Sequence, residues 1–151
     1  IPKRYLLNGD PYHCECYKTS RLIATELGLT EAQYLTTFQS RFGREEWLKP
    51  YTDATLKLLP AQGVTSVQVF CPGFSADCLE TIEEIGEENK EYFLHAGGQR
   101  YEYISALNAE PEHIAALCQL IYDNLHGWQN TNTDHRALRA EALQQKMREQ
   151  T

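Results

Sequence analysis

The sequence predicts an α/β fold in which a short, mostly parallel sheet is flanked by helices. Helical and strand patterns alternate along residues 12–125, and this alternation is typical of parallel strands joined by crossover helices. A chain of 151 residues with 42% hydrophobic content is also long enough for one domain with its own core. Ligands bind beyond the carboxyl ends of strands in such sheets. We therefore expect the functional loops at residues 39–51, 71–76 and 105–110.

Helices are expected where apolar residues recur at helical spacing or where a capping signal is present. Gly28 suits the C-cap of the first helix, Thr52 the N-cap of the second, and Pro111 the first turn of the last. The expected helices cover about residues 12–27, 52–59, 77–94 and 111–125.

Strands are expected in three short segments that are rich in β-branched and aromatic residues. They cover residues 33–38, 67–70 and 101–104. Residues 1–11 end in the turn-forming run Asn8-Gly9-Asp10-Pro11, so they are predicted to be an extended lead-in followed by a turn.

Two parts are distinguished along the chain. Residues 1–126 carry the alternating pattern, whereas residues 127–151 are a polar linker followed by a charged helical tail. The sequence opens on Ile1-Pro2 without a Met, directly before a loop-like stretch. We expect it to be an interior piece of a longer protein.

Composition excludes several classes of function. The net charge of -7 argues against a nucleic-acid partner, because phosphate neutralisation needs clustered Lys and Arg. No apolar run approaches the roughly 18 residues of a transmembrane segment. An odd number of irregularly spaced cysteines predicts reduced thiols and a cytoplasmic protein; they are Cys14, Cys16, Cys71, Cys78 and Cys118.

The expected helix at residues 77–94 is strongly acidic on one side. Glu80, Glu84 and Glu88 form a stripe with Asp77 beside them, and like charges four residues apart destabilise a helix by about 0.2–0.5 kcal/mol per pair. A bound cation would relieve this repulsion, while a solvated acidic face is the alternative that spacing alone leaves open. The opposite face is expected to be buried; it carries Cys78, Ile82, Ile85 and Phe93.

Four segments resemble the ferrochelatase family. Residues 70–85 read Phe-Cys-Pro-Gly-Phe-Ser-Ala-Asp-Cys-Leu-Glu-Thr-Ile-Glu-Glu-Ile, which is similar to the family signature of a strand, Pro-Gly-Phe and Asp-x-x-Glu-Thr. Residues 38–53, with Phe-Gln-Ser-Arg-Phe-Gly and then Trp-Leu-Lys-Pro-Tyr-Thr-Asp, resemble the loop beside the family's porphyrin cleft. Two shorter segments also fall in the order expected for the family, Asn8-Gly9-Asp10-Pro11-Tyr12 before these and Ala106-Leu107-Asn108 after them. The resemblance covers about residues 1–126.

The resemblance implies a function. Ferrochelatases insert ferrous iron into protoporphyrin IX to form protohaem, in a cleft between two similar α/β lobes. This chain would be the carboxyl-terminal lobe, three-layered and Rossmann-like, with the amino-terminal lobe missing. Glu80 would be the catalytic carboxylate and an iron ligand, paired with a histidine that lies immediately before the position of Ile1. The fragment alone is expected to be inactive.

Further site residues follow from the same resemblance. Glu84, Glu88 and Asp77 would be additional metal contacts, while Trp47 and Arg41 would contact the porphyrin. No cofactor is expected beyond the substrate iron. Some ferrochelatases hold an iron–sulfur cluster largely with cysteines near the carboxyl end, and because no cysteine follows Cys118 here, no such cluster is expected. A non-catalytic metal- or porphyrin-binding lobe, and a related chelatase for cobalt or nickel, remain as alternatives.

Overall fold

The computed structural model describes residues 1–125. The chain divides into two compact units, Ile1–His113 and Ile114–Thr151. All residues of the candidate site belong to the first unit. The tail expected at residues 127–151 lies outside the described residues.

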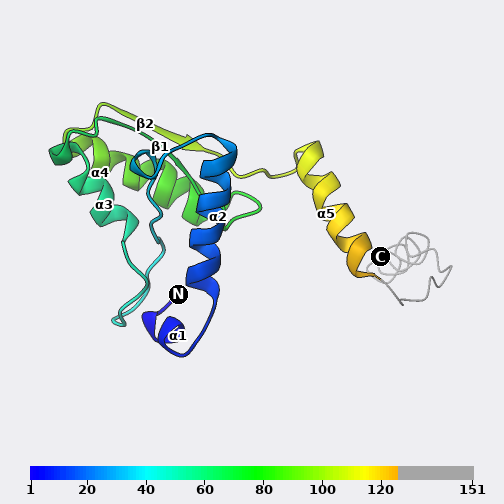
Figure 1. Cartoon of the computed structure of the whole chain (residues 1–151). Helices are drawn as coiled ribbons and strands as arrows, with labels where there is room; N and C mark the ends of the chain where they lie inside the picture. The colour runs from blue at the N-terminus through cyan, green and yellow to red at the C-terminus, as the bar shows by residue number, and fades with distance from the viewer. Residues whose placement is uncertain (126–151) are drawn as a thin grey trace, which may run out of the picture. The chain divides into compact units, whose positions relative to one another are not determined.

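A two-stranded parallel sheet forms the centre of the first unit. β1 (Ser66–Phe70) pairs with β2 (Arg100–Ile104), with Ser66 opposite Arg100 and Phe70 opposite Ile104. Along β1, half-buried residues alternate with exposed ones, as the twofold side-chain period of a strand requires. The α/β class is confirmed, since helices flank this short parallel sheet (Figure 1).

The crossover from β1 to β2 runs through a π-helix, Glu80–Glu88, followed without a break by α4, Asn89–His95. Both segments contact β2, and α3 (Thr52–Leu58) packs against α4. Phe93 of α4 is completely buried and lies against the backbone of Gly98, where a Cβ atom would come within 2.2 Å of the ring. The core therefore sits between the crossover and the sheet.

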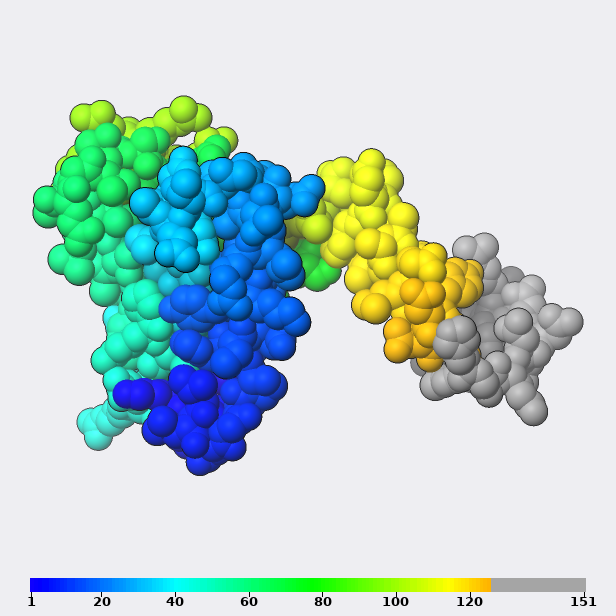
Figure 2. Space-filling view, viewed as in Figure 1, coloured from blue at the N-terminus to red at the C-terminus, as the bar shows by residue number. Residues whose placement is uncertain are grey.

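The remaining helices are α1 (Lys3–Leu7), α2 (Tyr12–Glu26) and α5 (Pro111–Asn124). α1 and α2, in blue, form much of the near face of the first unit in Figure 2. α1 corrects the expectation of an extended lead-in. The loop before Trp47 holds this segment, because Lys3 donates its N–H to the Glu46 carbonyl at 2.8 Å and Pro2 forms a bridge with Trp47.

The strand expected at residues 33–38 does not form. Glu31–Gln33 is a single turn of 3₁₀ helix, and Phe38 makes one isolated parallel bridge with Tyr51. The Phe38 carbonyl accepts the N–H of Thr52 at 3.1 Å. The next parallel pair toward the N-terminus would need an N–H from Pro50, which has none. The segment therefore has one isolated bridge and forms no strand.

Two details of the predicted helices are also wrong. The N-cap of α3 is Tyr51, and Thr52 lies inside the helix, where its Oγ1 donates to Thr37 Oγ1 at 2.9 Å. The helix expected from Asp77 begins at Glu80 and has π geometry over its first nine residues.

The wide turns of the π-helix change which residues are buried. The buried positions repeat every four residues; they are Thr81, Ile85, Asn89 and Phe93. Ile82, expected on the buried face, is 53% exposed. An i→i+5 bonding pattern lengthens the turn beyond the 3.6 residues of an α-helix, which keeps a four-residue repeat on one side.

None of the helices within residues 1–125 is both long and apolar enough to span a membrane.

Candidate functional site

Asp77 organises the entrance to the π-helix. Its Oδ1 accepts hydrogen bonds from the Tyr103 hydroxyl at 2.6 Å, Thr81 Oγ1 at 3.0 Å and the Ala106 N–H at 3.2 Å. Its Oδ2 accepts the Asn108 side-chain amide at 2.8 Å. These donors, Asn108 first and Tyr103 second, lower the pKa of Asp77 to about 2. The ionised carboxylate is thereby fixed between the end of β2 and the first turn of the π-helix.

Glu80 is the first residue of the π-helix, and its side chain is exposed. Hydrogen bonds from the Cys78 thiol and from its own backbone N–H lower the pKa of Glu80. Its backbone carbonyl accepts the Gln39 side-chain amide at 3.0 Å, and Gln39 Oε1 accepts the Cys71 thiol at 3.1 Å. Glu80 therefore presents an ionised, accessible carboxylate from a backbone that the 39–51 loop holds.

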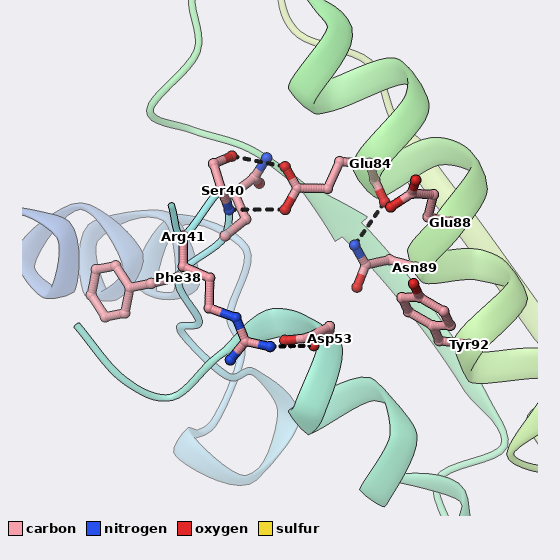
Figure 3. A pocket seen from close by; sticks show the side chains of 9 residues that line it. Phe38, Ser40, Arg41, Asp53, Glu84, Glu88, Asn89 and Tyr92 are labelled. Carbon is pink, nitrogen blue, oxygen red and sulfur yellow. Dashed lines mark hydrogen bonds and ion pairs between the residues drawn. The ribbon is translucent and has the colours of Figure 1, made fainter. Parts of the chain in front are cut away.

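Glu80, Glu84 and Glu88 form an acidic row along the helix. Glu84, the second acid of this row, is bound by a single residue of the 39–51 loop. The Ser40 N–H donates to Glu84 Oε1 at 2.8 Å, and Ser40 Oγ donates to Oε2 at 2.9 Å (Figure 3). Ser40 adopts a φ of 60°, a left-handed conformation that is uncommon for a residue with a Cβ.

A pocket of about 180 Å³ lies between the loop and the π-helix (Figure 3). Glu84 and Glu88 line it, whereas Glu80 and Asp77 do not. Its lining residues are Phe38, Gln39, Ser40, Arg41, Asp53, Glu84, Glu88, Asn89 and Tyr92.

Asn89 closes the pocket on the helix side and is only 2% exposed. Its Nδ2 donates to the Glu84 carbonyl at 2.7 Å, while its Oδ1 has no hydrogen-bond partner. Within residues 1–125, no three His, Cys, Asp or Glu side chains converge into a metal-binding group. The acidic residues are arranged as a row along the helix and not as a closed ligand cage.

The two expected porphyrin contacts lie in different surroundings. Arg41 lines the pocket, pairs with Asp53 at 2.9 Å and stacks over the Tyr51 ring at 4.3 Å from its centroid. Trp47 is half-buried outside the pocket and donates its indole N–H to the Phe42 carbonyl at 2.9 Å. The structure thus brings Arg41, but not Trp47, to the side of the acidic row.

Cys71 directly follows the last residue of β1. Burial, followed by the nearby charges of Glu84 and Asp77, raises the pKa of the Cys71 thiol to about 12. The group is a neutral thiol at physiological pH, which suits its role as a hydrogen-bond donor to Gln39.

Ser40, Asn89 and Tyr103 are site residues that sequence reasoning missed. Ser40 lies within the Phe-Gln-Ser-Arg-Phe-Gly segment, and Asn89 directly follows Glu87 and Glu88. Both positions carried a signal as polar residues next to the site. Nothing in the pattern around Tyr103 indicated that its hydroxyl would reach Asp77.

The fold and the site define an α/β lobe whose parallel sheet leads into an acidic π-helix beside a polar loop. The sequence model of the ferrochelatase family matches residues 1–125. The chain belongs to the ferrochelatase family.

Similar relatives are named ferrochelatase. The one from Idiomarina loihiensis is 71% identical over 95% of this chain, and that from Pseudoalteromonas atlantica is 76% identical over 85% of it. A third, from Marinobacter nauticus, is 65% identical over 96% of this chain. The chain spans only 40%, 36% and 40% of these relatives' lengths, respectively.

Proposed function

We propose that this chain is the carboxyl-terminal lobe of a ferrochelatase, which inserts ferrous iron into protoporphyrin IX and forms protohaem. The observation that carries the proposal is the family match over residues 1–125, which includes the whole π-helix with Glu80, Glu84 and Glu88. The relatives are more than twice as long as the matched segment, and the family resemblance implies that the missing part is an amino-terminal lobe.

Glu80 is proposed as the catalytic carboxylate. Insertion requires ferrous iron to shed water and the macrocycle to lose its two pyrrole N–H protons, and a carboxylate can bind the ion transiently or accept a proton. Glu80 fits this task because it is exposed and its pKa is lowered, so that it is ionised at neutral pH. A histidine of the missing lobe would face it across the porphyrin.

Glu84 and Glu88 are proposed to contact the metal further along the helix, on the wall of the pocket. Asp77 was predicted to join them, and the four donors on its carboxylate favour a main role in fixing the start of the helix. We propose any metal contact of Asp77 as secondary to that role.

Arg41 and Trp47 are proposed to contact the porphyrin. The Arg41 guanidinium offers donors that match a propionate carboxylate, and its ion pair with the Asp53 carboxylate at 2.9 Å supports this proposal. Trp47 would contribute its ring to the rim of the cleft. We further propose a cytoplasmic enzyme that uses no resident cofactor or iron–sulfur cluster and has no nucleic-acid partner.

The test uses a chimera in which this chain replaces the matching segment of the Idiomarina loihiensis ferrochelatase. We expect the chimera to insert ferrous iron into protoporphyrin IX. Glu80→Gln should reduce the rate more than tenfold, which corresponds to roughly 1.4 kcal/mol of barrier. Glu83→Gln, an exposed acid of the same helix outside the row, is the matched control and should change the rate little.

Each contrary result has a defined meaning. A chimera that binds porphyrin but inserts no metal would identify a non-catalytic lobe. Preference for cobalt or nickel over iron would identify a related chelatase. Retention of more than about a tenth of the rate by Glu80→Gln would remove the catalytic role from this residue.

A further inference from the structure

The backbone and the side chain of Ser40 bind the same carboxylate. The N–H and Oγ donate to the two oxygens of Glu84 at 2.8 and 2.9 Å, across 44 residues of sequence. We propose that Ser40 is a positioning residue, which holds the Glu84 carboxylate in the orientation that receives ferrous iron. The inference deepens the proposed function and rests on it.

The backbone of Ser40 is shaped for this contact. A positive φ is disfavoured for a residue with a Cβ, and such conformations persist only where the surroundings over-determine them. At its φ of 60°, Ser40 turns both donors toward one carboxylate. The Ser40 N–H therefore bonds to Glu84 and does not extend the bridge that Phe38, two residues earlier, makes with Tyr51.

The neighbouring residue fixes the loop against the helix. Gln39 donates to the Glu80 carbonyl at 3.0 Å and accepts the Cys71 thiol at 3.1 Å. Because Gln39 sets the distance between loop and helix, Ser40 reaches Glu84 from a defined position. The loop thereby contacts two successive acids of the row. Gln39 binds the backbone carbonyl of Glu80, and Ser40 binds the carboxylate of Glu84.

The two donors leave Glu84 suited to bind a cation. Hydrogen bonds to an ionised carboxylate are short and strong, and each oxygen keeps a second lone pair. Glu84 and Glu88 both line the pocket (Figure 3). If the Glu84 side chain were free to rotate, ordering it on metal binding would cost part of the binding free energy. The hydrogen bonds from Ser40 order the side chain in advance and so avoid this cost.

Two substitutions separate positioning from simple tethering of the loop. Ser40→Ala and Ser40→Gly both lose the Oγ donor, but glycine also relieves the positive φ. In the chimera we expect Ser40→Gly to have a higher Tm than Ser40→Ala. Both should raise the KM for ferrous iron by about tenfold, the effect of one hydrogen bond to a charged group, with little change in kcat. An iron KM that follows the Tm would overturn the inference.

A double-substitution cycle tests whether Ser40 acts through Glu84. Glu84→Gln should raise the iron KM, and adding Ser40→Ala should raise it no further. Additive effects, or no effect of Glu84→Gln, would contradict the proposal. Ser20→Ala is the matched control, because Ser20 Oγ donates only to the Cys16 carbonyl within α2 at 3.1 Å; it should leave the iron KM unchanged.

Failure of the proposed function is recognised separately. If the unsubstituted chimera inserts no iron, the proposed function is overturned. Positioning is then decided by crystal structures of the chimera with and without Ser40→Ala. A rotated Glu84 carboxylate in the variant supports the inference, and an unmoved one refutes it.

Discussion

The Tyr103 hydroxyl donates a 2.6 Å hydrogen bond to the Asp77 carboxylate. This contact connects the end of β2 with the turn that precedes the π-helix. Burial first, and this bond second, raise the pKa of Tyr103, whereas the pKa of Asp77 is lowered to about 2. The proton therefore stays on the phenol, and the carboxylate stays ionised.

Asp77 should make the stability of the fold depend on acid pH. Because its pKa falls from the ordinary 3.8 to about 2 on folding, its stabilising contribution is fully present above the unfolded value and is lost as the pH falls through about 2. We expect Asp77→Asn to lower the Tm of the chimera at pH 7. The difference in Tm between the variant and the parent, measured by circular dichroism, should shrink between pH 5 and pH 2. Tyr103→Phe is a companion variant that removes the hydroxyl donor and keeps the Asp77 carboxylate. A difference independent of pH would contradict this role.

Gly98 should not tolerate a side chain. A Cβ there would meet the buried Phe93 ring at 2.2 Å, and overpacking a core costs about 1–3 kcal/mol. We expect Gly98→Ala to lower the urea midpoint of unfolding. Gly86→Ala is the control, since the nearest atom to its Cβ is 3.5 Å away; it should be neutral or stabilise by up to about 1 kcal/mol. Equal changes in the urea midpoint for the two substitutions would contradict this prediction, because they would show that the Phe93 ring moves to make room for the Cβ of residue 98.

Cys71 should resist alkylation in the folded protein. The thiolate is the reactive form, and the raised pKa of about 12 makes it scarce at pH 8. We expect iodoacetamide to modify Cys71 at least about tenfold more slowly than the exposed Cys14, measured by peptide mass spectrometry. Unfolding in guanidinium should equalise the two rates. Rapid modification of Cys71 in the native state would exclude the buried, protonated thiol.

Much of the fold could be predicted because its signals are local. β1, β2 and α2 follow from apolar periodicity and turn residues, and the structure confirms them within one or two positions. The strand predicted at residues 33–38 failed because pairing depends on the partner. Its neighbour contains Pro50, whose missing N–H stops the ladder.

The π-helix could not be predicted because distant side chains contribute to its geometry. Its carbonyls at Glu80 and Ile85 accept hydrogen bonds from the distant side chains of Gln39 and Tyr101, respectively. Periodicity assumes α-helical turns and cannot register these donors. The acidic row could be predicted from spacing and family resemblance. The two hydrogen bonds from Ser40 to Glu84 could not, because they depend on the positive φ of Ser40, which the sequence does not reveal.

The wide turns of the π-helix set the angular phase of its carboxylates. Glu80, Glu84 and Glu88 recur with the same four-residue interval as the buried Thr81, Ile85 and Asn89. Deleting one uncharged residue, such as Gly86, would keep every acid yet rotate Glu88 away from Glu80 and Glu84. The spatial alignment of these charges is therefore encoded in the number of residues per turn as much as in the acids themselves.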